Sequence, residues 1–237
     1  MANKILFKAD SRGYANHGWL KSHHTFSFAG YFNNDRVHFG ALRVLNDDYV
    51  KGGNGFGRHP HDNMEIISIP LEGKLAHQDS MGNDGTISVN EIQVMSAGTG
   101  VQHSEFNASE VDPVKFLQIW LFPNKQNVTP RYDQIQLDPA DRKNKFQQVI
   151  SPNPDDAGTW IHQDAWFHLL ELDAQRSLTY NFKKSGNGLF VFVLEGEAEI
   201  AGELLERRDA LGITDTDTVE ISTHKDSFVL FIEVPML

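Results

Sequence analysis

The sequence predicts an all-β protein built from two tandem β units. Short apolar or alternating runs bounded by turn residues recur along the whole chain, which is the pattern of strands. These runs are residues 39–45, 65–70, 85–94, 114–122, 166–172, 189–194 and 227–234. Glycine-containing turns lie between them, as at 52–55, 82–85 and 185–188, and such turns mark hairpins and sheet edges. With 237 residues, the chain can bury a core in each unit.

A weak internal repeat supports the division into two units. Residues 67–73 (ISIPLEG) resemble residues 191–196 (VFVLEG), since each is a strand that runs into a Leu-Glu-Gly turn. We therefore expect a first domain over residues 1–135 and a second over residues 136–237. Asp138 followed by Pro139 is typical of a helix start, so we expect a short helix to connect the two domains.

Composition and charge exclude several classes of function. The chain has no cysteine, which excludes disulfides, thiolate zinc sites and cysteine nucleophiles. Its formal net charge is −11 and its lysines and arginines are scattered, so we expect no direct contact with nucleic acid. There is neither a signal-peptide pattern nor an apolar run of about 20 residues, so we expect a cytoplasmic protein without membrane contact.

Two pairs of metal-competent side chains carry the strongest functional signal. His59 and His61 flank a proline, and His103 and Glu105 flank a serine, so each pair is spaced i, i+2. Alternate side chains of a β-strand point to the same face, so each pair can present two ligands from one strand. If the two strands face each other, the four side chains form a three-histidine, one-carboxylate metal site. Imidazole and oxygen ligands suit iron, nickel, manganese, copper or zinc.

These residues lie in segments that resemble the two motifs of the cupin superfamily. The first runs from Gly53 through His59, His61 and Glu65 to Gly73, and the second runs from Gly98 to Asn107. The match departs from the pattern in two places, because Gly73 comes one residue late and Gly98 replaces a proline. Residues 58–62, 75–83, 93–98 and 103–107 together resemble the pirin family.

The resemblance to pirins implies a bicupin fold, in which two tandem jelly-roll β-barrels are present and only the N-terminal barrel binds metal. The second half of this chain is consistent with that, because Phe182, Lys184 and Thr218 align with the three histidines. In most cupins Glu65 would be the carboxylate ligand, whereas in pirins Glu105 takes that role. We favour Glu105, and Glu65 then becomes a hydrogen-bonding group or a proton shuttle beside the metal.

The resemblance also implies an enzyme, a metal-dependent flavonol (quercetin) 2,3-dioxygenase. The cofactor would be one divalent ion, foremost Fe(II), with Zn, Ni, Mn, Cu or Co as alternatives, and it would keep open positions for a small aromatic substrate and O2. We expect Glu105 to be the base that takes the proton of the flavonol 3-hydroxyl. A second hypothesis is a non-enzymatic, iron-dependent redox sensor that binds a partner protein. A third is a Lewis-acid isomerase. Two barrels in one chain favour a monomer.

The other polar and aromatic candidates receive structural interpretations. His77 and Asp79 also have i, i+2 spacing, but they follow a Leu-Glu-Gly turn, so we expect a solvent-facing hairpin or hydrogen bonds within the turn. We assign polar or surface roles to four further histidines, namely His23, His24, His162 and His168. Phe26, Phe28 and the tryptophans are expected in the core rather than in a substrate pocket.

Overall fold

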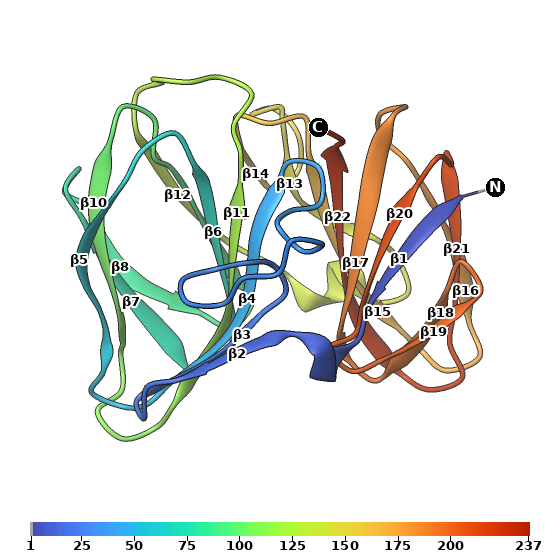
Figure 1. Cartoon of the computed structure of the whole chain (residues 1–237), viewed down its shortest axis with the longest axis horizontal. Coiled ribbons are helices and arrows are strands. Elements are labelled where there is room, and N and C mark those ends of the chain that lie inside the picture. Colours follow the sequence, from blue (N-terminus) through green and yellow to red (C-terminus); the bar gives the residue numbers. More distant parts are fainter. Residues whose placement is uncertain (1) are drawn as a thin grey trace.

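The computed structural model describes residues 2–237, which fold into two β-barrels lying side by side (Figure 1). The first barrel pairs a seven-stranded sheet with a four-stranded sheet. In spatial order, the larger sheet consists of β12 (Arg131–Gln136), β9 (Glu91–Ser96), β6 (Glu65–Glu72), β11 (Val114–Leu121), β4 (Leu42–Val50), β3 (Leu20–His24) and β2 (Gly13–Asn16). The smaller sheet consists of β5 (Gly55–His61), β10 (Val101–Asn107), β7 (Lys74–Asp79) and β8 (Asp84–Ser88).

The second barrel has the same construction. Its larger sheet consists of β1 (Asn3–Phe7), β20 (Ala210–Thr214), β17 (Asn187–Glu195), β22 (Ser227–Pro235), β15 (Trp166–Leu172), β13 (Gln147–Ser151) and β14 (Thr159–Trp160). Its smaller sheet consists of β16 (Ser177–Asn181), β21 (Thr218–Ser222), β18 (Glu197–Ile200) and β19 (Glu203–Glu206). The predicted all-β fold of two tandem barrels is confirmed.

The two Leu-Glu-Gly turns occupy equivalent corners of the two barrels. Gly73 separates β6 from β7 and has φ +75°, and Gly196 separates β17 from β18 and has φ +78°. A positive φ is a conformation that glycine adopts without steric cost. In each barrel, the repeated tripeptide therefore marks the point at which the chain passes from the larger sheet to the smaller one.

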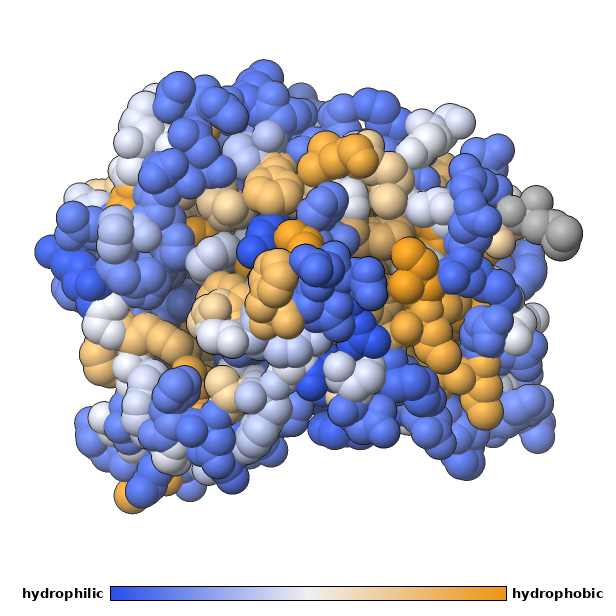
Figure 2. Space-filling model, viewed as in Figure 1, coloured by the Kyte–Doolittle hydropathy of each residue, from blue (hydrophilic) through white to orange (hydrophobic). Residues whose placement is uncertain are grey.

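One strand departs from the expected domain division. Residues 1–135 were assigned to the first domain, yet β1 hydrogen-bonds to β20 and forms the edge of the second barrel's larger sheet (Figure 1). Phe7 at the end of β1 is buried, so the apolar side chain fixes the strand against the second barrel. The division itself, placed between residues 135 and 136, remains a prediction. On the face in Figure 2, apolar side chains gather over the region of β1, where Ile5 is 56% exposed.

Two short 3-10 turns are the helical elements of residues 2–237. They are η1 (Ala9–Ser11) and η2 (Pro139–Arg142). The second lies in the connection between the barrels, and the Asp138 carboxylate accepts a hydrogen bond from the backbone N–H of Ala140 at 2.9 Å. Neither turn is long or apolar enough to cross a lipid bilayer.

The largest apolar cluster lies between the two barrels. One face of each larger sheet contributes to it, with Ile67 and Ile69 from β6 and Phe190 and Phe192 from β17 among its members. The opposite faces point into the barrels. A separate apolar cluster fills the interior of the second barrel, whereas the interior of the first contains many of the buried polar residues. The candidate site therefore lies inside the first barrel, where the polar side chains are.

Candidate metal centre

The two ligand-bearing strands lie next to each other rather than on facing walls. β5 and β10 are antiparallel neighbours in the smaller sheet of the first barrel, and His103 pairs directly with His59. The facing arrangement that the sequence analysis set as the condition for a shared site is therefore not the one present. The i, i+2 pairs still meet, because neighbouring strands are about 4.8 Å apart and side chains of the same face stand side by side.

A β-bulge interrupts the ladder at the site. His103 pairs with His59, but Glu105 pairs with Phe56, so β5 has one residue more than β10 over this interval. Bulges bend a strand and redirect its side chains, and they are frequent beside active sites. Here the bulge lets Phe56 and His59 both line the same pocket although they are three residues apart.

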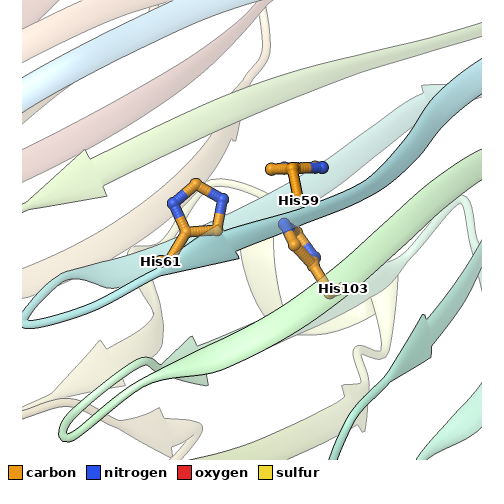
Figure 3. A group of neighbouring side chains, drawn as sticks. All are labelled: His59, His61 and His103. Atoms are coloured by element: carbon orange, nitrogen blue, oxygen red, sulfur yellow. The ribbon is translucent and has the colours of Figure 1, made fainter.

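The three histidines converge on one point (Figure 3). Their ring centroids are 4.4 Å apart for His59 and His103 and 4.9 Å for His61 with either partner, and one ring nitrogen of each lies within 4.8 Å of the others. His59 Nδ1 lies 2.8 Å from the carbonyl oxygen of Gly57. A hydrogen bond there would orient the ring and leave Nε2 free as a ligand.

Burial keeps the imidazoles of His61 and His103 neutral. Together with a smaller contribution from neighbouring histidines, it lowers the pKa of His103 to about 2 and that of His61 to about 4. Both ring nitrogens of His103 are buried without a hydrogen-bond partner among the described residues. A buried polar atom without a partner is costly, and a neutral imidazole is the form that binds metal. The residues present therefore fit a metal ion.

Glu105 is held from the opposite sheet. Its carboxylate accepts hydrogen bonds from Ser68 Oγ at 2.9 Å and from Gln118 Nε2 at 2.6 Å. The side chain is buried, and burial raises the pKa of Glu105 to about 7. Glu105 forms a second potential metal-binding group with His77 and His103, whose ligand atoms also lie within 4.8 Å of one another. The four predicted residues thus belong to two groups that share His103.

His77 does not lie on a solvent-facing hairpin, and that expectation was wrong. β7 pairs with β10, so His77 is opposite Glu105 and points into the barrel, where it is 2% exposed. The alternative expectation, hydrogen bonds within a turn, is confirmed for Asp79. Its carboxylate accepts from the backbone N–H groups of Met81 and Asn83 at 2.8 and 3.0 Å.

Glu65 lies on the other face of the larger sheet. The chain turns at Asn63, which has φ 44°, so β6 is a new strand and the side-chain alternation of β5 does not continue into it. Glu65 points to the same face as Ile67 and Ile69, toward the second barrel, and accepts a hydrogen bond from Ser96 Oγ at 2.7 Å. It belongs neither to the metal-binding groups nor to the pocket lining, so a proton-shuttle role beside the metal is not supported.

A pocket of about 600 Å³ opens onto two of the three histidines. His59, His61 and Glu105 line one part of it, and aromatic side chains line much of the rest, namely Tyr14, Phe28, Tyr31, Phe56 and Trp120. Trp120 packs edge-on against His61 with ring centroids 4.9 Å apart. Phe28 and Trp120 therefore line the pocket, whereas Phe26 is in the core as expected. The volume is that of a small-molecule site.

The pocket contains residues that the sequence pattern did not single out. Gln118, Asn46 and Asp48 line it from the larger sheet, and His24 lines it as well although we expected a structural role. Alternation along β4 is the available signal, because Val44, Asn46, Asp48 and Val50 share one face. That face could not be assigned to a pocket without knowing which strands stand beside it.

Among residues 2–237, the second barrel holds no group of metal-competent side chains equivalent to that of the first. Phe182 follows β16, Thr218 begins β21, and the interior beside them is filled by apolar members of one cluster, including Tyr180, Val219 and Ile221. His168 is buried there, and its Nδ1 lies 3.3 Å from the hydroxyl oxygen of Tyr180. His162 and His168 are absent from the metal-binding groups found among residues 2–237.

Comparison with known proteins agrees with this geometry. The pirin family model matches residues 7–121, and a model described as the quercetinase C-terminal cupin domain matches residues 148–234. Quercetin 2,3-dioxygenase of Escherichia coli is 41% identical over 230 residues, which are 97% of this chain and 98% of that protein. The chain belongs to the pirin family.

Solved structures place this pirin close to its bacterial relatives. The crystal structure of YhhW from Escherichia coli superposes with a TM-score of 0.95 at 40% identity and covers 99% of both chains. The structure of the bacterial pirin YhhW in complex with nickel(II) superposes with a TM-score of 0.94 at 39% identity, covering 99% of this chain and all of that one. A pirin-like protein of Caulobacter vibrioides is 37% identical over 225 residues, or 94% of this chain and 96% of that protein.

Proposed function

We propose that this pirin is a metal-dependent dioxygenase that opens the ring of a flavonol such as quercetin, with Fe(II) as the metal. The observation that carries the proposal is the convergence of three histidines, two of which, His59 and His61, line a pocket of about 600 Å³ with aromatic walls. A relative at 41% identity is named quercetin 2,3-dioxygenase, and a relative at 39% identity has been solved in complex with nickel(II).

The proposed metal ligands are His59, His61, His103 and Glu105. The unpartnered nitrogens of buried His103 and the carboxylate of Glu105 provide a donor set of imidazole and oxygen, which suits a divalent transition metal. When bound, the metal would supply Lewis acidity and open coordination positions for a substrate oxygen and O2.

The remaining chemistry belongs to side chains of this chain. Glu105 lines the pocket, so its carboxylate is available to accept the proton of a flavonol 3-hydroxyl. Ser68 and Gln118 hold that carboxylate through two hydrogen bonds and so fix its direction. The rings of Phe28 and Trp120 pack with centroids 5.4 Å apart, forming an apolar wall that would hold a planar aromatic and exclude water.

The test is an anaerobic reconstitution with Fe(II), followed by quercetin and then air. We expect carbon monoxide to be released at the same rate as the flavonol absorbance decreases. A His103→Ala variant should show neither change. An enzyme with a full complement of iron that leaves quercetin unchanged would contradict the proposal. That result would favour the alternative, an iron-dependent redox sensor that binds a partner protein. Turnover that does not consume O2 would instead indicate a Lewis-acid isomerase.

A further inference from the structure

A row of polar side chains crosses the larger sheet on the face that points into the first barrel. His24 of β3 is opposite Asn46 of β4, Asn46 is opposite Gln118 of β11, and Gln118 is opposite Ser68 of β6. Gln118 and Ser68 are the two residues that hold Glu105. The residues at one end of this row, Ser68 and Gln118, therefore orient the carboxylate of Glu105. The residues at the other end, His24 and Asn46, have no role in the metal site described above.

Asp48 extends the end formed by His24 and Asn46 by two residues along β4. It lies opposite Ser22 of β3 and shares the face of Asn46. His24, Asn46 and Asp48 are 3%, 2% and 5% exposed, and all three line the pocket that reaches the histidines.

Each of the three residues has a buried polar atom without a partner among the described residues. The atoms are His24 Nδ1, Asn46 Oδ1 and Asp48 Oδ1. Burial raises the pKa of Asp48 to about 7, because the carboxylate is removed from water. Leaving one such atom unsatisfied is unfavourable, and three of them in one pocket point to a ligand that supplies hydrogen-bonding groups.

We propose that His24, Asn46 and Asp48 form a hydroxyl-binding subsite that orients a polyhydroxylated aromatic substrate by the ring farthest from the metal. This inference rests on the proposed function and names the substrate feature that the pocket selects. Two hydroxyls of that ring donate to the oxygens of Asn46 and Asp48, and His24 Nδ1 pairs with one of the same hydroxyls.

The arrangement of the strands gives the subsite a suitable reach. Asp48 lies one strand away from Gln118, which holds Glu105, and two residues farther along, so the Cα atoms of Asp48 and Gln118 are about 8 Å apart. The 3-hydroxyl of a flavonol and the hydroxyls of one outer ring are separated by a comparable span. A flavonol whose 3-hydroxyl approaches Glu105 would therefore direct the hydroxyls of an outer ring toward the three unpartnered atoms.

The experiment compares two ligands on the Zn(II)-loaded protein without oxygen. Quercetin carries hydroxyls on its outer rings, and 3-hydroxyflavone carries the 3-hydroxyl alone. We expect Asp48→Leu and Asn46→Leu each to weaken quercetin binding by about tenfold or more, because each removes a buried hydrogen-bond acceptor. The affinity for 3-hydroxyflavone should stay within about threefold, since that ligand does not reach the subsite.

The control is Asp35→Leu, which removes an exposed carboxylate outside the pocket lining and should preserve the ratio of the two affinities. Zinc content and melting temperature establish that each variant is folded. The subsite is overturned if both pocket variants keep the wild-type ratio, or if they weaken both ligands equally. If the pocket variants weaken quercetin binding selectively but the Fe(II)-loaded wild type does not turn over quercetin, only the proposed function is contradicted. If the wild type turns over quercetin but the variants keep the wild-type ratio of the two affinities, only the subsite is contradicted.

Discussion

His103 lies directly opposite His59 across the β5–β10 ladder, and their ring centroids are 4.4 Å apart. Two imidazoles at this distance place their nitrogens close enough to share an ion. The same strand pair brings His61 to the group. A cross-strand pair on one sheet is a rigid support, because backbone hydrogen bonds fix its register.

The first prediction concerns metal binding. His61→Ala and His103→Ala should each abolish stoichiometric metal while the protein stays folded, because each removes one of three converging imidazoles. Metal content after dialysis, measured by mass spectrometry together with circular dichroism, checks this. The same substitution at exposed His224 serves as the control. Full retention of metal by both site variants would remove the proposed centre.

The second prediction concerns the support of Glu105. Gln118→Leu removes the 2.6 Å hydrogen bond to the carboxylate at nearly constant volume. We expect metal affinity to fall by about 10- to 100-fold, because groups that orient a ligand contribute that much to metal binding. Competition with a chelator measures the affinity. Gln136→Leu, at an exposed position of β12, should leave it unchanged, and an unaltered affinity in Gln118→Leu would mean that Glu105 is not a ligand.

The third prediction is a pH dependence that originates in the second barrel. Burial lowers the pKa of His168 from 6.5 to about 3, so the unfolded chain binds more protons than the folded one between these values. The folded state is therefore most stable, with respect to this histidine, above pH 6.5, and it loses stability as the pH falls toward 3. Between pH 6 and pH 4, the stability of the wild type relative to His168→Gln should decrease by about 2 kcal/mol. Urea denaturation at several pH values measures it, and parallel profiles would contradict it.

The fourth prediction concerns the contact between the barrels. Phe190 packs against Phe7, Phe26 and Phe39, with ring centroids 5.3 to 5.5 Å apart. Phe190→Ala should lower the free energy of unfolding by about 3 to 5 kcal/mol, because a large buried side chain is replaced by a cavity. Denaturant unfolding checks this. Phe32→Ala, at a side chain that is 72% exposed, should change stability by no more than about 0.5 kcal/mol. Equal effects would show that the interface does not depend on Phe190.

Much of the fold was predictable, because the alternation of apolar residues and the glycine turns are local features. The runs at 114–122 and 166–172 correspond closely to β11 and β15, while the run at 85–94 proved to be two strands, β8 and β9. The pairing of β1 with the second barrel was not predictable from the sequence. It depends on pairing with β20, about 200 residues away along the chain, and local patterns carry no information on such partners.

The sequence by itself determined the identity of the metal-competent residues and the tandem all-β architecture, because both follow from spacing along single strands. Only the tertiary structure decided which side chains meet. It turned Glu65 away from the site, brought His77 into the barrel, and placed Asn46 and Asp48 in the pocket. The physical reason is that a strand's alternation fixes which residues share a face, whereas the neighbouring strands and the turns between them decide what that face contacts.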